Sequence, residues 1–310
     1  MKVCLNCDRR FDAEGWRCSA CGFEPAAADG MLLFAPEKAD TGEGFDVDAF
    51  ERLARQEPAS FWFRSRNRLI IQILRRHFSE ARSLLEVGCG TGFVLTGIER
   101  AGPEIRLVGS ELHPAGLAFA KRRLPRVEFL QMDARRIPFD SEFDVVLALD
   151  VIEHIEEDEL VLDQMFRSVR PGGGVIITVP QHPRLWSAND EYSQHKRRYR
   201  RAELLSKLRR AGFEPNQITS FVTSLLPLMA VSRARQRDVQ SFDPSGEYHA
   251  PRAVDRALEA MLDAERWLIA RGVSLPAGGS LVAVATRPLS SGAATTQHTD
   301  AALGRKVWSR

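Results

Sequence analysis

The fold of this chain is decided by the stretch Ser83–Phe93, which reads SLLEVGCGTGF. A short apolar segment runs into an acidic residue and is followed by three glycines spaced two apart. Because glycine takes positive φ and lets the backbone approach a ligand closely, we predict a ligand-binding turn between a strand and a helix. A dinucleotide fingerprint would need its third glycine one position later, where Phe93 stands. The carboxylate of Glu86 would also repel a pyrophosphate, whereas it suits a ligand with an ammonium or sulfonium group.

The turn resembles motif I of the class I S-adenosylmethionine-dependent methyltransferases, which has the pattern (Asp/Glu)-x-Gly-x-Gly-x-Gly. S-adenosylmethionine carries both an ammonium and a sulfonium group. The matching positions are Glu86, Gly88, Gly90 and Gly92, and the resemblance implies that they hold the methionyl end of this cofactor. It also implies an α/β fold, with a Rossmann-like, doubly wound sheet of seven strands in which the last strand is antiparallel.

The next segments contain the neighbours that this family places after motif I. Residues 105–111 read as a strand ending in Glu111, about 20 residues past the glycines, where nucleotide-binding folds place a carboxylate on the ribose hydroxyls. We therefore predict that Glu111 and the adjacent Leu112 bind the cofactor. A third strand follows, and the resemblance implies that Asp133 lies at the adenine amino group with the backbone amide of Ala134 nearby.

The remaining strands complete the predicted sheet. Residues 143–150 form a continuous apolar run, typical of a parallel strand covered on both faces, and Asp150 ends it at the ligand edge. Residues 170–174 resemble the Pro-Gly-Gly turn that precedes strand five in this family, which is expected at 175–180. The last, antiparallel strand is expected at 281–286. Each feature alone also fits a purely structural interpretation, so the prediction depends on their shared order.

Four of the five cysteines form two Cys-x-x-Cys pairs near the N-terminus, with ten residues between the pairs. The candidate metal ligands are Cys4, Cys7, Cys18 and Cys21. The pattern resembles a small zinc ribbon, because four thiolates suit tetrahedral zinc and so short a segment has too little core to fold unaided. Two disulfides or a redox site are the alternatives. Arg9, Arg10 and Arg17 leave contact with RNA open.

The chain is expected to divide into a zinc ribbon at 1–24, a linker at 25–44, a methyltransferase domain at 45–288 and a tail at 289–310. The linker is rich in Ala, Asp, Gly and Pro and contains one short apolar segment, MLLF. The tail is rich in Ser, Ala and Thr and is expected to be disordered.

A helix is expected at 61–74, with Ser60 as its N-cap. It begins with the aromatic residues Phe61, Trp62 and Phe63. They either close over the cofactor or pack the helix onto the sheet.

The overall composition is that of an ordinary globular protein, and 44% hydrophobic residues can supply the core of one large α/β domain. Lys and Arg total 43 against 41 acidic residues, a formal net charge of +2, so global basicity does not recruit nucleic acid or an anionic membrane. The sequence shows no apolar leader and no run long enough to span a bilayer. We therefore expect a cytoplasmic protein, with peripheral attachment to a membrane as the alternative.

Two histidines are the candidate general bases. The loop after strand four borders the transferring methyl in similar methyltransferases, and it contains His154, whose unperturbed pKa lies near neutrality. The second candidate lies in 189–199, which resembles the Asp-x4-His-x-Arg-Arg-Tyr segment of a broad bacterial subgroup. His195 and Tyr199 are expected to face the pocket while Arg198 steadies an acidic group. The alternatives are a helix cap for His154 and a structural loop-to-helix junction for the second segment.

Residues 221–231 are apolar, and Arg233, Arg235 and Arg237 follow them. A buried helix is expected, with a membrane-interfacial segment at 221–237 or the wall of a greasy channel as alternatives. We predict methyl transfer to an O or N atom of a small-molecule, glycan or lipid-linked acceptor. RNA methylation guided by the ribbon and a non-catalytic nucleotide-binding module are the alternatives. The glycine spacing disfavours a nicotinamide-dependent oxidoreductase.

Overall fold

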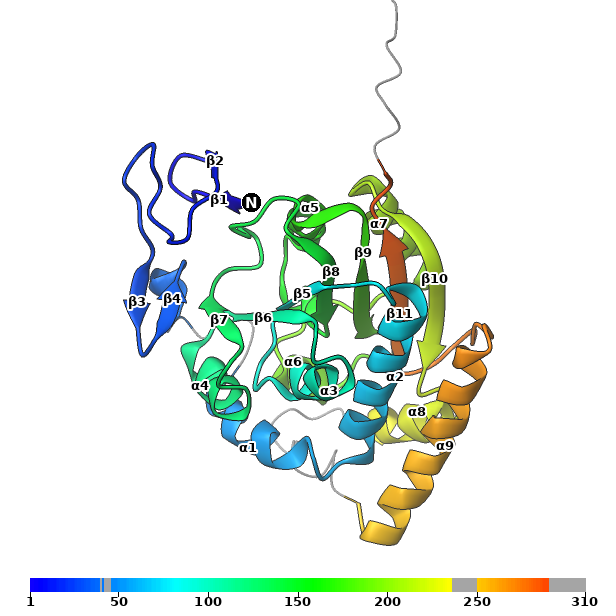
Figure 1. Cartoon of the computed structure of the whole chain (residues 1–310). Helices are drawn as coiled ribbons and strands as arrows, with labels where there is room; N and C mark the ends of the chain where they lie inside the picture. The colour runs from blue at the N-terminus through cyan, green and yellow to red at the C-terminus, as the bar shows by residue number, and fades with distance from the viewer. Residues whose placement is uncertain (40, 42–45, 236–249, 290–310) are drawn as a thin grey trace, which may run out of the picture.

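The computed structural model describes residues 1–39, 41, 46–235 and 250–289, and a nine-stranded sheet lies at its centre (Figure 1). The strands of this sheet are β3 (Ala26–Ala28), β4 (Met31–Leu33), β5 (Ser83–Val87), β6 (Arg106–Glu111), β7 (Glu128–Gln131), β8 (Phe143–Leu149), β9 (Val169–Pro180), β10 (Glu214–Phe221) and β11 (Ser280–Thr286). Their spatial order is β10-β11-β9-β8-β5-β6-β7-β4-β3. The neighbouring strands from β9 to β4 in this order all pair in parallel. Strand β3 is antiparallel to β4. Strand β11 is antiparallel to both β9 and β10, which confirms the predicted antiparallel last strand.

The described sheet has nine strands rather than the predicted seven, because the segment expected to be a linker, 25–44, contributes β3 and β4. Strand β4 pairs in parallel with β7, with Leu32 opposite Leu130. The side-chain amide of Gln131 accepts a hydrogen bond from the backbone N–H of Ala35 at 3.0 Å and donates one to its carbonyl at 2.7 Å. The apolar segment in the expected linker therefore covers what would otherwise be an exposed edge of β7.

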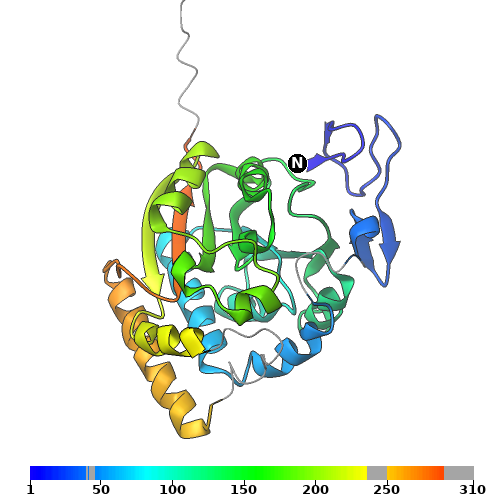
Figure 2. The same ribbon diagram turned by 180° about the vertical axis from the view of Figure 1, so that it is seen from behind.

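Helices cover both faces of the sheet, and each face has its own apolar core (Figures 1 and 2). The helices are α1 (Ala49–Gln56), α2 (Phe61–His77), α3 (Phe93–Ala101), α4 (Pro114–Arg123), α5 (Asp158–Ser168), α6 (Ala188–Tyr192), α7 (Arg201–Arg210), α8 (Leu226–Arg235) and α9 (Arg252–Ala270), with short 3₁₀ turns η1 (Pro36–Lys38), η2 (Ile152–His154) and η3 (Pro183–Leu185). Helices α2, α3, α4 and α9 contribute to one core, and α5 and α7 to the other. Along β8, Val145 and Leu147 belong to the first core and Val146 and Ala148 to the second, as the two-residue period of a strand requires.

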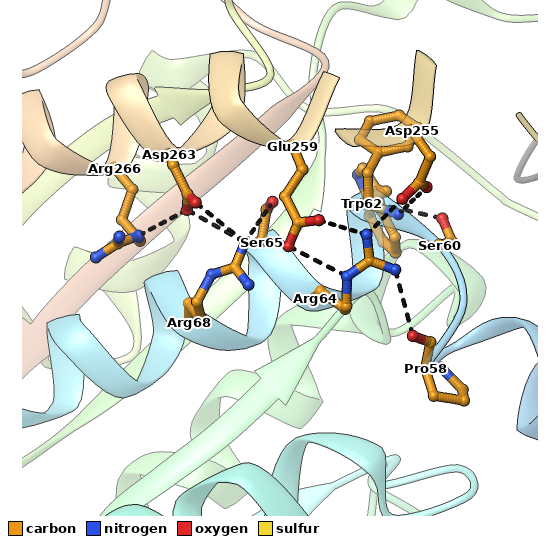
Figure 3. A network of polar contacts seen from close by, with 11 residues as sticks. Pro58, Ser60, Trp62, Arg64, Ser65, Arg68, Asp255, Glu259, Asp263 and Arg266 are labelled. Carbon is orange, nitrogen blue, oxygen red and sulfur yellow. Dashed lines mark hydrogen bonds and ion pairs between the residues drawn. The ribbon is translucent and has the colours of Figure 1, made fainter. Parts of the chain in front are cut away.

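Ion pairs attach α9 to α2 (Figure 3). Helix α2 begins as predicted, because the side chain of Ser60 accepts a backbone hydrogen bond from its first turn. Arg64 contacts Asp255 and Glu259, each at 2.5 Å, and Arg68 contacts Glu259 at 2.6 Å. The hydrogen bonds from Arg64 and Arg68 lower the pKa of Glu259 to about 2, although partial burial opposes this. The start of α2 is thereby fixed beside α9, and both helices contribute to the site described below.

The turn expected at 170–174 lies within the bounds of β9 rather than before the strand. Phe143 of β8 pairs with Val169, whereas Val145 pairs with Gly174. The residues of β9 between these two pairs therefore leave the ladder, and regular pairing resumes at the residues predicted for strand five.

The cysteine-bearing N-terminal segment packs on the sheet domain. Strands β1 (Lys2–Val3) and β2 (Arg10–Phe11) form a short antiparallel pair. The ring of Trp16 packs edge-to-face on Phe34 and Phe139, with centroid distances of 4.7 and 5.4 Å. The segment therefore shares one of the two main cores instead of standing apart from it.

Two predictions concern the membrane and the C-terminus. Of the helices in the described ranges, none combines the length and the apolar character that crossing a bilayer requires. Residues 290–310 of the predicted tail, and residues 236 and 237 of the predicted interfacial segment, lie outside the described residues.

Candidate active site

The three glycines form the predicted turn between β5 and α3. Gly88, Gly90 and Gly92 have φ values of 67°, 52° and 75°, in the left-handed region that residues with side chains rarely adopt. A Cβ at Gly88 would lie 2.5 Å from a methyl of Val151, and one at Gly92 would lie 3.0 Å from the Cβ of Ala120. Both the backbone conformation and the close packing of the loop therefore require glycine.

Glu86 lies in β5 just before the turn and is 2% exposed. No hydrogen-bond partner for its Oε2 atom is found among the described residues. Burial raises the pKa of Glu86 to about 8, although the positive charge of Arg66 opposes the rise. A buried carboxyl with an unused oxygen costs free energy unless a partner is supplied. The position therefore fits a ligand that brings an ammonium group or another hydrogen-bond donor.

Glu111 ends β6 beside the glycine turn. Its Oε2 accepts the backbone N–H of Gly90 at 3.1 Å, and its Oε1 accepts that of Leu112 at 2.8 Å. Burial raises the pKa of Glu111, while these backbone donors and His113 favour the ionised form. Because each carboxylate oxygen has two lone pairs, Glu111 can still accept the ribose hydroxyls that its predicted role requires.

Asp133 follows β7 and is held by two cations that the sequence did not indicate. Lys38 contacts its Oδ2 at 2.7 Å, and Arg135 contacts its Oδ1 at 2.9 Å. Although burial opposes ionisation, the hydrogen bonds from Arg135 and Lys38 lower the pKa of Asp133. The carboxylate therefore remains an acceptor, as a role at the adenine amino group demands.

These residues surround one cavity of about 280 Å³. The predicted site residues that line it are Glu86, Gly88, Gly90, Glu111, Leu112, Asp133, Ala134, Asp150, His154 and His195. Gly92 does not line it and packs against α4 instead. Trp62 and Phe63 also line this cavity. Phe61 and Trp62 pack against one of the two main cores and Phe63 is itself buried, so the aromatic start packs α2 onto the sheet, as one of the two interpretations predicted, and its closure over a cofactor stays a prediction.

A second cavity of about 370 Å³ adjoins the first, with Trp62, Asp150, Ser193 and His195 lining both. Its apolar lining includes Val222, Leu225, Leu228, Met229 and Leu258, and its polar lining includes Glu153, Asn189, Arg198 and Arg233. The apolar segment after β10 is therefore the wall of a cavity, one of the alternatives considered. It is not a plain buried helix, because Leu228 is 61% exposed.

Asp150 lies where the two cavities meet. Its φ of 56° is uncommon for a residue with a side chain, and such conformations persist only where the surroundings enforce them. Arg66 of α2 pairs with its Oδ2 at 2.5 Å and also contacts the hydroxyl of Thr178 at 3.5 Å. Nothing in the sequence pattern distinguishes Arg66 from the other basic residues of this helix.

His154 and His195 come together at the same junction, with ring centroids 4.7 Å apart. The Nδ1 of His195 lies 2.9 Å from Oδ1 of the fully buried Asp190. Arg198 donates to both oxygens of Asp190, at 2.6 and 2.9 Å, so Arg198 does steady a neighbouring carboxylate. These hydrogen bonds from His195 and Arg198 outweigh burial and lower the pKa of Asp190 to about 2. Both histidines therefore stay candidates for a role in catalysis.

The structure contradicts the predicted catalytic position of Tyr199. Its side chain is fully buried and lines neither cavity. The hydroxyl donates to Asp158 at 2.6 Å, and Lys207 contacts the same carboxylate at 2.5 Å. Burial, followed by the hydrogen bond to Asp158, raises the pKa of Tyr199. The ring turns into the core shared with α5 and α7, which the local sequence pattern could not show.

The four N-terminal cysteines converge on one point. The sulfurs of Cys4 and Cys21 lie 3.5 Å apart and those of Cys7 and Cys18 lie 3.8 Å apart. All four sulfurs lie within 4.8 Å of one another, and none is in a disulfide. Zinc bound at about 2.3 Å by four sulfurs places them roughly 3.8 Å apart, so the observed spacing fits the ion. The metal itself stays a prediction.

Sequence reasoning assigned no role to Glu153, which is fully buried next to His154. It lies in η2, three residues after Asp150, and this short turn brings its side chain to the second cavity. Its position directly before the candidate base His154 is a signal that the sequence contains. Its complete burial could not be predicted from the sequence.

Residues 85–177 match a family model described as a methyltransferase domain. This segment is therefore similar to methyltransferase domains. A probable S-adenosylmethionine-dependent methyltransferase of Mycolicibacterium smegmatis is 31% identical over 161 residues, which are 50% of this chain and 60% of that protein. A ubiquinone biosynthesis O-methyltransferase of Rickettsia bellii is 29% identical over 114 residues, which are 35% of this chain and 47% of that protein. The chain thus spans about half the length of these curated relatives.

One solved structure with a similar chain is phosphoethanolamine N-methyltransferase 2 of Haemonchus contortus in complex with S-adenosyl-L-methionine. It is 19% identical, with a TM-score of 0.48, and the match covers 70% of this chain and 51% of that chain. The family match and the relatives thus make this part of the chain similar to S-adenosylmethionine-dependent methyltransferases.

Proposed function

We propose that this chain transfers a methyl group from S-adenosylmethionine to an oxygen or nitrogen atom of a small-molecule, glycan or lipid-linked acceptor. The observation that carries the proposal is the buried carboxyl of Glu86, which has an unused oxygen among the described residues and lies directly before the glycine turn. A donor that carries an ammonium and a sulfonium supplies the positive charge that this position lacks.

The chain's own contribution is mainly positioning. S-adenosylmethionine supplies an activated methyl group, whose transfer to an acceptor lone pair leaves S-adenosylhomocysteine. Glu86 and the glycine turn hold the methionyl end, Glu111 holds the ribose and Asp133 holds the adenine. The start of α2 excludes water on one side. Bringing the reacting atoms to roughly 3 to 3.5 Å in the right orientation supplies most of the rate enhancement such a reaction needs.

The second cavity supports the choice of acceptor. Its apolar wall suits a hydrophobic part of the molecule, while the junction with the cofactor cavity is polar. His154 and His195 lie at this junction, where they position the reacting atom and take up its proton. The names of several relatives support an acceptor of this kind, among them ubiquinone biosynthesis, demethylmenaquinone and phthiotriol/phenolphthiotriol dimycocerosates methyltransferases.

Titration with S-adenosylhomocysteine tests the cofactor half of the proposal. In calorimetry, Glu111→Ala should weaken its binding about tenfold or more, because two charge-assisted hydrogen bonds to the ribose are lost. Glu104→Ala removes an exposed carboxylate of the same domain and should leave the affinity unchanged. Equal affinities of the two variants would remove Glu111 from the ribose role.

Incubation with methyl-labelled S-adenosylmethionine tests the acceptor half. Cell extract is first separated into small-molecule, lipid, glycan and RNA fractions, and each is then supplied as acceptor. We expect label in the small-molecule, glycan or lipid fraction. Label confined to RNA would establish the ribbon-guided alternative, and cofactor binding without label in any fraction would favour the non-catalytic module.

We also infer that the four cysteines hold a structural zinc ion. The thiolates of Cys4, Cys7, Cys18 and Cys21 would supply all four ligands, which leaves no open position for chemistry. Metal analysis should find one zinc per chain, and Cys18→Ser should reduce this content. Chelation should unfold the loops that carry the cysteines, because the ion would be what joins the two Cys-x-x-Cys pairs. An N-terminal segment that keeps its structure after complete metal removal would contradict the assignment.

A further inference from the structure

We propose that Glu153, His154 and His195 form a binding site for a divalent first-row metal ion at the junction of the two cavities. The inference rests on the proposed methyl transfer and refines it, because the ion would bind the hydroxyl oxygen of the acceptor. One potential ligand atom from each of the three side chains lies within 4.8 Å of the other two. Ligands about 2.0–2.2 Å from an ion lie up to about 4.4 Å apart, so small side-chain rotations close the site.

The carboxylate of Glu153 is the first reason to expect a cation. The residue is fully buried, and neither of its carboxylate oxygens is hydrogen-bonded to another residue in the described part of the chain. The nearby arginines are already engaged, Arg66 with Asp150 and Arg198 with Asp190. An uncompensated buried carboxylate is expensive, and an ion held between it and two imidazoles would compensate its charge.

The orientation of His195 is the second reason. Asp190 is fixed by two hydrogen bonds from Arg198, so the carboxylate accepts the Nδ1–H of His195 at 2.9 Å. This hydrogen bond leaves Nε2 with its lone pair available. Histidines that bind metals usually donate their other ring nitrogen to a carboxylate in this way, which sets the tautomer and the ring orientation.

The proposed ion would lie at the junction of the two cavities, where a substrate can reach its open coordination positions. His154 and His195 line the cofactor cavity, while Glu153 and His195 line the second one. One carboxylate and two imidazoles suit manganese, iron, cobalt or zinc, and leave positions for a substrate oxygen. With an ion bound, the imidazoles act as ligands instead of bases.

With the ion bound, methyl transfer needs no protein side chain to take up the acceptor proton. The acceptor hydroxyl binds the ion, its acidity rises, and its proton passes to solvent water. The oxygen lone pair forms the bond to the methyl carbon, and the carbon–sulfur bond breaks with its electron pair remaining on sulfur.

Manganese is the probe for the test, because a hard ion prefers oxygen and nitrogen ligands and the thiolates of the cysteine cluster select zinc. The full chain is first loaded with zinc and then titrated with Mn²⁺, while electron paramagnetic resonance measures the free ion. We expect about one bound Mn²⁺ in the wild type. Glu153→Gln and His154→Gln should each weaken the binding by about 10–100-fold.

Glu156→Gln is the matched control, because Glu156 lies in the same loop with its side chain 73% exposed, and it should bind Mn²⁺ as the wild type does. Mn²⁺ should raise the melting temperature of the wild type and of this control but not that of Glu153→Gln. The Glu153→Gln protein should fold about as stably as the wild type without metal, since the amide is close in size to the carboxyl it replaces and the oxygens of Glu153 make no hydrogen bond among the described residues.

Equal Mn²⁺ affinity of wild type and Glu153→Gln, or no bound Mn²⁺ in the wild type, would overturn the metal site. S-adenosylhomocysteine is titrated into the same samples to separate this result from the proposed function. Cofactor binding without Mn²⁺ binding refutes the metal site alone, whereas loss of cofactor binding in the wild type refutes the proposed methyl transfer.

Discussion

The first cavity, which we propose binds the cofactor (the cofactor cavity), and the second, which we propose binds the acceptor (the acceptor cavity), share lining residues but are built in different ways. The cofactor cavity lies at the ends of parallel strands and includes glycines with positive φ in its lining, beside residues of α1 and α2 such as Phe50 and Trp62. The acceptor cavity is lined by residues of segments far apart in the chain, and two of them, Asp150 and Arg198, are held by ion pairs with Arg66 and Asp190. Substitutions in the glycine turn should therefore act through backbone strain. Substitutions in the ion pairs of the acceptor cavity should act by leaving a buried charge without its partner.

The largest effect is expected at the acceptor side, for Arg198→Ala. The fully buried carboxylate of Asp190 would lose its cation, and removing one partner of such a pair typically costs about 3–5 kcal/mol. Urea unfolding should show a loss of this size. If the two sides are built independently, the variant that remains folded at low temperature should bind S-adenosylhomocysteine within about twofold of the wild type.

Arg184→Ala is the control for this loss, because Arg184 is an exposed arginine in the same region of the chain. Its stability should stay within about 0.5 kcal/mol of the wild type. A loss below about 1 kcal/mol in Arg198→Ala would show that water compensates Asp190, and the comparison between the two cavities would lose its basis.

The cofactor side should break at Gly88→Ala. The left-handed φ of 67° costs a non-glycine residue about 1–2 kcal/mol, and the new Cβ would lie 2.5 Å from a methyl of Val151. We expect S-adenosylhomocysteine binding to weaken by about 2–3 kcal/mol, or roughly 30- to 150-fold, in calorimetry.

Val151→Ala in the Gly88→Ala background separates the two causes. The closest atoms to the new Cβ are the methyls of Val151, so their removal should restore part of the affinity and leave the cost of φ. Identical affinities of single and double variant would attribute the whole effect to the backbone conformation.

The same contrast explains what could be predicted from sequence. The glycine turn, Glu111 and the strand ends were predicted because each depends on a few consecutive residues. Burial of Tyr199 against α5, and the compensation of Asp150 by Arg66, depend on residues far away in the chain. Strands β3 and β4 were missed for a related reason: a short apolar segment acquires strand structure only through the edge that it covers.

A smaller effect on the cofactor side is expected for Glu86→Gln. With a pKa of about 8, Glu86 is mostly protonated in the free protein at pH 7, and an ammonium bound beside it would favour the ionised form. Binding of S-adenosylhomocysteine should therefore release a proton, and its affinity should rise with pH up to about 8. Calorimetry in buffers of different ionisation enthalpy should detect this proton in the wild type.

The Glu86→Gln protein should release no proton and bind about tenfold more weakly at pH 8. Its stability provides a second measurement with a defined sign. Because the pKa of Glu86 is raised in the folded state, the free wild-type protein should lose folding stability as pH rises from about 4.5 to about 8. The Glu86→Gln protein should not show this loss. Proton release that persists in the variant would exclude Glu86 as its source.

The smallest effect is expected on the acceptor side, at Leu228. This residue lines the second cavity while remaining 61% exposed, so Leu228→Ser removes apolar contact with a bound acceptor at little cost to folding. We expect acceptor binding to weaken by roughly 1 kcal/mol. At limiting concentration of the extract fraction that accepts the label, this should appear as a fewfold decrease in the initial rate of methyl incorporation, with the affinity for S-adenosylhomocysteine unchanged. Val231→Ser, at an exposed position of the same helix that does not line the cavity, should leave the rate unchanged. If both serine variants slow incorporation equally, α8 acts as an apolar surface, and the membrane-interfacial interpretation of this segment replaces the channel wall.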